Sequence, residues 1–163
     1  MLALGIDPGT ATTGYAVVRQ VGSSLQAVCY GVITTPAGKA MHLRLQTLFQ
    51  ELQAIIRTYQ PTLCAVEELF FQKNVKTAIS VAQARGVILL ALAECGLQPG
   101  EYTPMQVKQA VVGYGNATKA QVQHMTQLLL ALESPAKPDD AADALAVAIC
   151  HLHNQTAYSL AQL

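Results

Sequence analysis

The chain has 163 residues, carries no net charge at neutral pH, and contains 52% hydrophobic but only 12% charged residues. This apolar composition excludes intrinsic disorder, and the length favours a single domain with a substantial core. No apolar run reaches the roughly 20 residues of a membrane helix, and the few residues before Asp7 lack the basic leader of a signal peptide. The four cysteines lie far apart without a CxxC pair, which is typical of reduced thiols in a cytoplasmic protein.

The first part of the chain predicts three short strands joined by turns. The segments are LALGID (2–7), GYAVVRQ (14–20) and SLQAVCYGVITT (24–35). Because the connecting segments GTATT and QVGSS are short, we expect the three strands to pair antiparallel.

Helices and strands alternate after Ala40. Apolar residues at helical spacing predict a helix from Met41 to Tyr59. The segment TLCAVEE (62–68) is apolar on both sides, which favours a central parallel strand. A long helix over 74–95 follows, and then a short strand, PGEYT (99–103).

Three further helices complete the predicted order. Thr103 is the expected N-cap of the first, and Asn116 or Thr118 caps the second. The last helix is DDAADALAVAICHLH (139–153), before a loosely held tail over 154–163. We therefore expect one α/β domain over 1–153, with a five-stranded mixed sheet, three antiparallel strands first and then parallel ones, flanked by helices.

Acidic residues gather at the ends of these elements. They follow the first strand, the fourth strand and the start of the last helix: Asp7, Glu67, Glu68, Asp139, Asp140 and Asp143. Open α/β sheets place ligands at the edge where the carboxyl ends of parallel strands meet. Carboxylates gathered there would repel one another unless cations such as Mg²⁺ neutralised them. Two Mg²⁺ ions about 3.5–4 Å apart can stabilise both oxygens of a phosphoryl displacement, so the pattern predicts phosphodiester hydrolysis.

Each acid also has an ordinary structural interpretation. Asp-Pro-Gly is common turn chemistry, and acids at a helix N-terminus interact favourably with the helix dipole. Asp139 and Asp143 are four residues apart and Asp140 and Asp143 are three apart, so either pair shares one helix face. The spacing alone leaves this choice open.

The stretch from residue 73 to 119 holds most of the candidate phosphate-binding side chains. It contains two acids and five basic residues, which are Lys73, Lys76, Arg85, Lys108 and Lys119. If four acids were neutralised by metal, six would remain against ten Lys and Arg residues, which suits a DNA-binding surface. On charge alone, these side chains could equally belong to solvated helix faces.

Five segments in order resemble the RuvC family of Holliday-junction resolvases. They are GIDPGTATTGYAVV, AVEELFFQKN, AQARGV, QVKQAVVGYGNATKAQVQHM and DDAADALAVAICHLH, and the resemblance runs from about residue 2 to 153. It implies an RNase H-like fold, a homodimer, and paired symmetric nicking of four-way DNA junctions in recombination and repair. It also implies dependence on Mg²⁺, two ions per site, with Mn²⁺ as a substitute, and cooperation with the RuvA–RuvB branch-migration complex.

The resemblance assigns roles to particular residues. The acidic ligands of the family fall on Asp7, Glu67, Asp140 and Asp143, which leaves Asp139 and Glu68 as neighbours. The site lysines fall on Lys108 and Lys119, and Phe70 matches a residue that stacks on a junction base; Phe70 could instead pack in the core or at a dimer contact. The helix over 74–95 is our candidate dimer surface, through Ala78, Val81, Ala82, Arg85 and Leu89.

Three rival interpretations remain. The DPGT segment also occurs in actin-like ATPases, although these need two lobes and this chain has the length of one. The chain could also be a junction-binding protein without catalysis, or a nuclease of the same fold with another nucleic-acid substrate.

Overall fold

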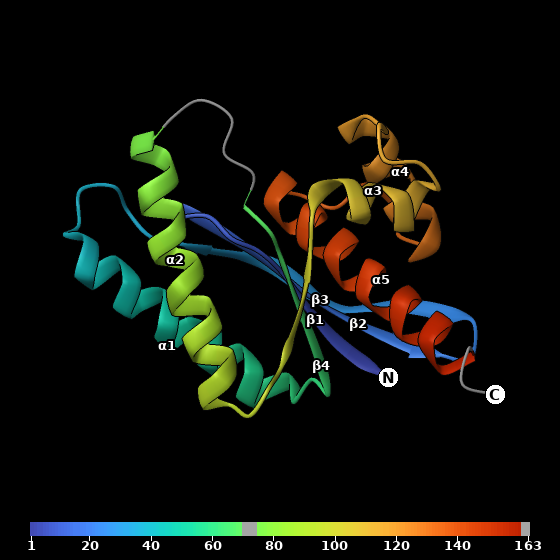
Figure 1. Cartoon of the computed structure of the whole chain (residues 1–163), viewed down its shortest axis with the longest axis horizontal. Coiled ribbons are helices and arrows are strands. Elements are labelled where there is room, and N and C mark those ends of the chain that lie inside the picture. Colours follow the sequence, from blue (N-terminus) through green and yellow to red (C-terminus); the bar gives the residue numbers. More distant parts are fainter. Residues whose placement is uncertain (70–74, 161–163) are drawn as a thin grey trace.

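The computed structural model describes residues 1–69 and 75–160, which form one sheet with helices on both faces (Figure 1). The strands are β1 (Leu2–Asp7), β2 (Thr12–Val21), β3 (Ser24–Thr34), β4 (Leu63–Glu67) and β5 (Pro99–Tyr102). The helices are α1 (Met41–Tyr59), α2 (Val75–Glu94), α3 (Pro104–Val112), α4 (Lys119–Leu129) and α5 (Asp139–Leu160). No helix in the described ranges is long and apolar enough to cross a membrane.

The sheet has the order β3-β2-β1-β4-β5. β1 pairs antiparallel with β2, and β2 pairs antiparallel with β3. β4 runs parallel to both β1 and β5. The predicted mixed sheet is therefore confirmed, with β1 and β4 as neighbours.

Two hydrophobic cores lie on opposite faces of this sheet. Strand β1 contributes to both, because its side chains alternate between the faces. Ala3 packs with α3, α4 and α5 on one face, whereas Leu4 and Ile6 pack with α1 and α2 on the other. The four cysteines are free, as the sequence predicts.

Helix α5 packs directly on β1 because a glycine faces it. A Cβ atom on Gly5 would lie 2.3 Å from the main-chain oxygen of Ala144 and 2.5 Å from the nitrogen of Ala148. Small side chains on both elements thus bring the helix close to the strand, and the helix is buried from Ala144 to Leu152.

Helix α5 also ends later than expected. It continues past Asn154 to Leu160, where the sequence suggested a loose tail. The Asn154 side chain donates to the carbonyl of Cys150, and the Thr156 hydroxyl bonds the Gln20 side chain on β2. These contacts hold the helix to the sheet beyond the predicted end.

Helices α3 and α4 each begin with a capping box. Thr103 caps α3 with Gln106, and Thr118, rather than Asn116, caps α4 with Gln121. Each pair satisfies two main-chain N–H groups at the helix start. The caps fix where α4 begins, and its first residue is Lys119.

Candidate active site

The carboxyl ends of β1 and β4 place two acids side by side. Ile6 pairs with Val66 in the parallel register, so Asp7 and Glu67 are the next residues along neighbouring strands. Asp7 also lies opposite Gly14 on β2. A Cβ atom on Gly14 would lie 2.0 Å from the main-chain oxygen of Asp140, so only a glycine allows the first turn of α5 to reach this edge.

The electrostatics show that the predicted acids lie close together. Burial, followed by the negative charge of Glu67, raises the pKa of Asp7 to about 8. The charges of Asp143 and Asp140 raise the pKa of Asp7 further. Burial, followed by the charge of Asp143, raises the pKa of Glu67 to about 7. Acids from three distant parts of the chain thus act on one another at a single edge.

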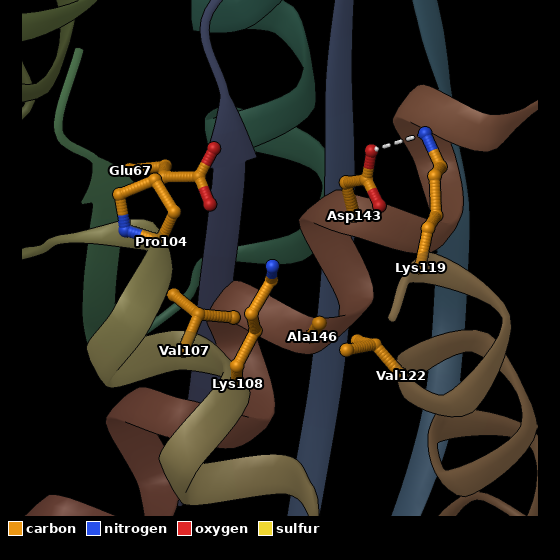
Figure 2. Close-up of a pocket in the computed structure, with 8 residues that line it drawn as sticks. All are labelled: Glu67, Pro104, Val107, Lys108, Lys119, Val122, Asp143 and Ala146. Carbon is orange, nitrogen blue, oxygen red and sulfur yellow. Dashed lines mark hydrogen bonds and ion pairs between the residues drawn. The ribbon is translucent and has the colours of Figure 1, made fainter. Parts of the chain in front are cut away.

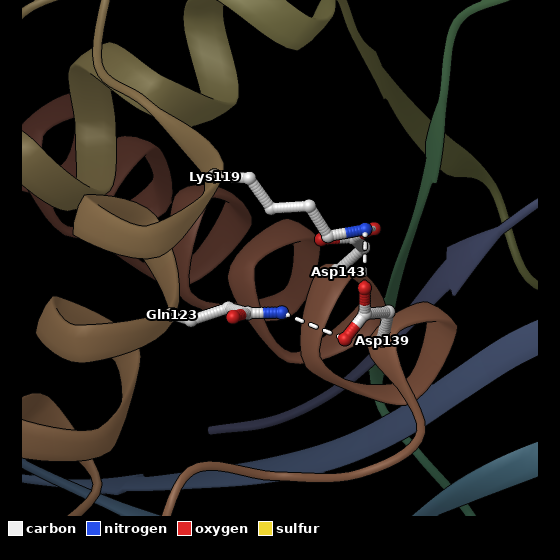
Figure 3. Close-up of polar contacts among 4 residues, drawn as sticks. All are labelled: Lys119, Gln123, Asp139 and Asp143. Atoms are coloured by element: carbon white, nitrogen blue, oxygen red, sulfur yellow. Dashed lines mark hydrogen bonds and ion pairs between the residues drawn. The ribbon is translucent and has the colours of Figure 1, made fainter.

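The ammonium group of Lys119 forms ion pairs with two acids of α5. Its Nζ atom lies 3.0 Å from Asp143 Oδ2 and 3.3 Å from Asp139 Oδ2 (Figure 3). Gln123 Nε2 donates to Asp139 Oδ1 at 3.0 Å. The hydrogen bond from Lys119 lowers the pKa of Asp139, the opposite of what happens to Asp7 and Glu67. Asp139 is therefore an exposed acid with partners of its own.

A cavity of about 230 Å³ opens beside these groups. Figure 2 shows Lys108 extending from α3 toward the space between Glu67 and Asp143. The remaining lining residues are Pro104, Val107, Lys119, Val122 and Ala146. The cavity thus has acids on one side, two lysines within reach and an apolar floor.

The acids do not form a ready-made metal cage. Within residues 1–69 and 75–160, no three His, Cys, Asp or Glu side chains are arranged to hold a metal ion as they stand. The donor set is nevertheless one of hard carboxylate oxygens, which suits Mg²⁺. The raised pKa values of Asp7 and Glu67 reflect burial and repulsion between negative charges, which the lysines offset only in part. A bound divalent cation would reduce this repulsion further.

The structure places the other predicted DNA contacts elsewhere or leaves them outside its description. Arg85 forms an ion pair with Glu101 and lines a second cavity of about 370 Å³ together with Glu68. Lys76 belongs to the first turn of α2, and its side chain lies outside the description. Phe70 and Lys73 lie outside the described residues.

Sequence reasoning missed the side chains that hold the turn after Asp7. Thr13 Oγ1 donates to the carbonyl of Gly9 at 2.6 Å, and Thr35 Oγ1 donates to the carbonyl of Thr10. Arg44 Nε in turn donates to Thr35 Oγ1 at 3.0 Å. Two of these bonds end on main-chain oxygens and the third on a hydroxyl, so no motif of side chains in the sequence could have revealed them.

The sheet order, the helices on both faces and the acidic edge define an RNase H-like α/β protein. The family model for crossover junction endodeoxyribonuclease RuvC matches residues 3–151. The chain therefore belongs to the RuvC family.

Known relatives agree with this assignment. The chain is 61% identical to the crossover junction endodeoxyribonuclease RuvC of Heliobacterium modesticaldum, over 96% of each chain. It is 58% identical to the protein of the same name from Syntrophomonas wolfei, over 94% of this chain and 90% of the other. The structure of Thermus thermophilus RuvC in complex with Holliday junction substrate matches with a TM-score of 0.90 and 33% identity, over 95% of this chain and 94% of that chain.

Proposed function

We propose that this protein is a DNA endonuclease that resolves four-way junctions by paired symmetric nicks, in recombination and repair. The observation that carries the proposal is the convergence of Asp7, Glu67, Asp140 and Asp143 on one sheet edge, with raised pKa values at the first two. Family membership supports the junction as substrate, because the Thermus thermophilus relative was captured with a Holliday junction.

The four acids are the residues that would hold the metal. Their carboxylate oxygens fit two Mg²⁺ ions, or Mn²⁺ in their place. Such a pair of ions supplies stabilisation of the attacking and leaving oxygens in a phosphodiester displacement. Asp139 and Glu68 are not part of this set: Asp139 is exposed and bonded to Lys119 and Gln123, and Glu68 lines the second cavity.

Both lysines are expected to contact the DNA once it is bound. Lys108 points into the cavity beside Glu67, where its ammonium would stabilise negative charge that develops on the phosphate. Lys119 holds Asp143 when no DNA is bound, and it would turn to a backbone phosphate when the acids are otherwise neutralised. Both lysines stand on helices that a capping box positions.

A homodimer forms part of the proposal, since a two-fold dimer matches two symmetry-related strands. Helix α2 supports it because the helix is apolar on two sides. Its buried side includes Ala84, Ile88, Ala91 and Leu92. On the opposite side, Ile79 is 58% exposed and Leu90 is 53% exposed, with exposed Gly86 between them. A helix apolar all round is normally buried all round, so a second copy would cover this stripe.

The stripe differs slightly from the surface expected from sequence. Of the residues named there, Ala82 is exposed, whereas Ala78, Val81, Arg85 and Leu89 are half-buried. We therefore centre the dimer contact on Ile79, Gly86 and Leu90. Cooperation with RuvA–RuvB and a cytoplasmic location remain part of the proposal.

The test is a cleavage assay on a mobile synthetic four-way junction with Mg²⁺. We expect paired nicks at symmetric positions, no cutting of a linear duplex of the same sequence, and no cutting without divalent metal. Asp7→Asn should bind the junction yet leave it intact. Cleavage by Asp7→Asn would contradict the site, and equal cleavage of the linear duplex would favour a nuclease with another substrate.

A further inference from the structure

A polar chain links the start of α1 to the turn that follows Asp7. Because β3 runs in the same direction as β1, its end lies at the edge of the sheet that carries the acids. Thr35, just past β3, is 3% exposed. Its main-chain N–H donates to the carbonyl of Ala11 at 2.9 Å, and its hydroxyl donates to the carbonyl of Thr10.

Arg44 fixes the orientation of that hydroxyl. A threonine hydroxyl has one hydrogen, and here it goes to Thr10, so the oxygen is left to accept a bond. Arg44 Nε donates to this oxygen at 3.0 Å. The Thr10 hydroxyl is itself buried without a partner in the described part of the chain. The position of the turn thus depends on the hydroxyls of Thr35 and Thr13 rather than on that of Thr10.

The terminal nitrogens of Arg44 lack a carboxylate partner. The structure describes the side chain of every acid in the sequence, and among the described side chains the ion pairs are those of Arg85 and Lys119. The first turn of α1 contains no acid, and exposed Lys39 precedes it. A half-buried guanidinium that is bonded through Nε keeps two Nη groups in a fork that matches a phosphate.

We propose that Arg44 binds a backbone phosphate of the DNA through its Nη groups while its Nε positions the Asp7 turn through Thr35. Arg44 is then a positioning residue: DNA binding orders the guanidinium, the guanidinium orders the Thr35 hydroxyl, and the hydroxyl holds the turn next to Asp7. This inference rests on the proposed nuclease function, since it assumes a DNA strand at the acidic edge.

The test separates phosphate binding from positioning with three variants and one control. Arg44→Gln removes both roles, Arg44→Lys keeps a charge without the fork, and Thr35→Val removes only the link to the turn. Arg57→Gln is the matched control, because Arg57 is exposed in the last turn of the same helix. The salt dependence of junction affinity is measured by fluorescence anisotropy in chelator, and the nicking rate is measured with Mg²⁺ at saturating protein. A thermal melt of each variant shows that it is folded.

For Arg44→Gln we expect the slope of log affinity against log salt to fall by about 0.9 per subunit. Its nicking rate should also fall by about ten- to a hundredfold, because the turn that positions Asp7 would shift. Thr35→Val should lose rate at an unchanged slope. Arg44→Lys should keep the slope and lose rate, and Arg57→Gln should match wild type in both.

Two results would overturn the inference. An unchanged salt slope in Arg44→Gln would show that Arg44 does not bind a phosphate. Wild-type nicking rates in both Thr35→Val and Arg44→Lys would show that Arg44 does not position the Asp7 turn. Failure of the proposed function is a different result: wild type itself would not nick the junction, whereas the salt slopes are measured on uncut DNA and do not depend on cleavage.

Discussion

Gly14 on β2 lies directly against the main-chain carbonyl of Asp140 in the first turn of α5. A side chain on Gly14 would begin 2.0 Å from that oxygen and 2.5 Å from its carbon. Both atoms belong to the backbone, so neither can move away as a flexible side chain could. This contact sets how closely the acids of α5 approach Asp7, which pairs with Gly14.

We therefore predict that Gly14→Ala moves the start of α5 and disables the site. Overpacking of this kind costs about 1–3 kcal/mol of stability, and the displaced acids should lower the nicking rate by at least tenfold, on the order of what small misplacements cost. Chemical denaturation and single-turnover nicking measure the two effects. Gly38→Ala is the control, because no atom lies within 4 Å of its Cβ position. Wild-type nicking by Gly14→Ala would show that this contact does not set the site.

The pKa values of Asp7, about 8, and Glu67, about 7, predict how metal-free stability depends on pH. A carboxyl whose pKa is higher in the folded than in the unfolded protein favours folding while protonated. That contribution is complete below pH of about 4 and is lost as the pH rises through about 7 to 8. We expect Asp7→Asn, which cannot ionise, to melt at a higher temperature than wild type near pH 8, with a smaller gain near pH 5.

Thermal melts in chelator across this range measure the effect. Glu133→Gln, at an exposed position, should follow the wild-type curve. Added Mg²⁺ should stabilise wild type more at the alkaline end, because metal binding requires the carboxyls to lose their protons. If the melting temperatures of wild type and Asp7→Asn changed with pH in parallel, the pKa of Asp7 would not be raised in the folded protein.

The choice between Asp139 and Asp140 can be tested directly. Asp140 acts electrostatically on Asp7, whereas Asp139 is exposed and bonded to Lys119. We predict that Asp140→Asn lowers the nicking rate by more than about a hundredfold. Asp139→Asn removes one partner of an exposed ion pair and should change the rate by no more than about fivefold. The reverse order, measured on the same junction, would exchange the two assignments.

The apolar stripe on α2 predicts how the dimer can be broken. Leu90→Glu puts a charge into the proposed contact and should give a monomer in analytical ultracentrifugation. Leu128→Glu is the matched control, because Leu128 on α4 is 59% exposed and Leu90 is 53% exposed. We expect the control to remain a dimer. A Leu90→Glu protein that sediments like wild type would place the interface elsewhere.

The neighbouring positions of Asp7 and Glu67 could be predicted from sequence because they follow from strand direction alone. Two apolar strands that each end in an acid have their carboxyl ends at one edge if they are parallel, and β1 and β4 are. The spacing could not choose between Asp139 and Asp140, since their places relative to Asp7 depend on how α5 docks on Gly5 and Gly14. That docking is a contact between segments more than a hundred residues apart.

Other features depended on long-range contacts in the same way. The end of α5 was predicted too early because Thr156 finds its partner, Gln20, at the other end of the chain. The bonds from Thr35 and Arg44 run to main-chain and hydroxyl oxygens, which have no signature in a linear pattern. By contrast, the start of α4 at Lys119 was accessible, because a threonine followed three residues later by glutamine is a local capping signal.

Helix α5 carries Asp140 on its first turn and Asp143 just after it, and the following turns are buried against β1 and β2. Its alanines therefore do more than fill the core, because their size sets the depth at which the whole helix rests on the sheet. Enlarging Ala148, which lies five residues and therefore more than one turn beyond Asp143, would tilt or lift the helix that carries these acids. Buried alanines of α5 that touch neither metal nor DNA should therefore tolerate mutation as poorly as the acids do, because both depend on how closely α5 packs on the sheet.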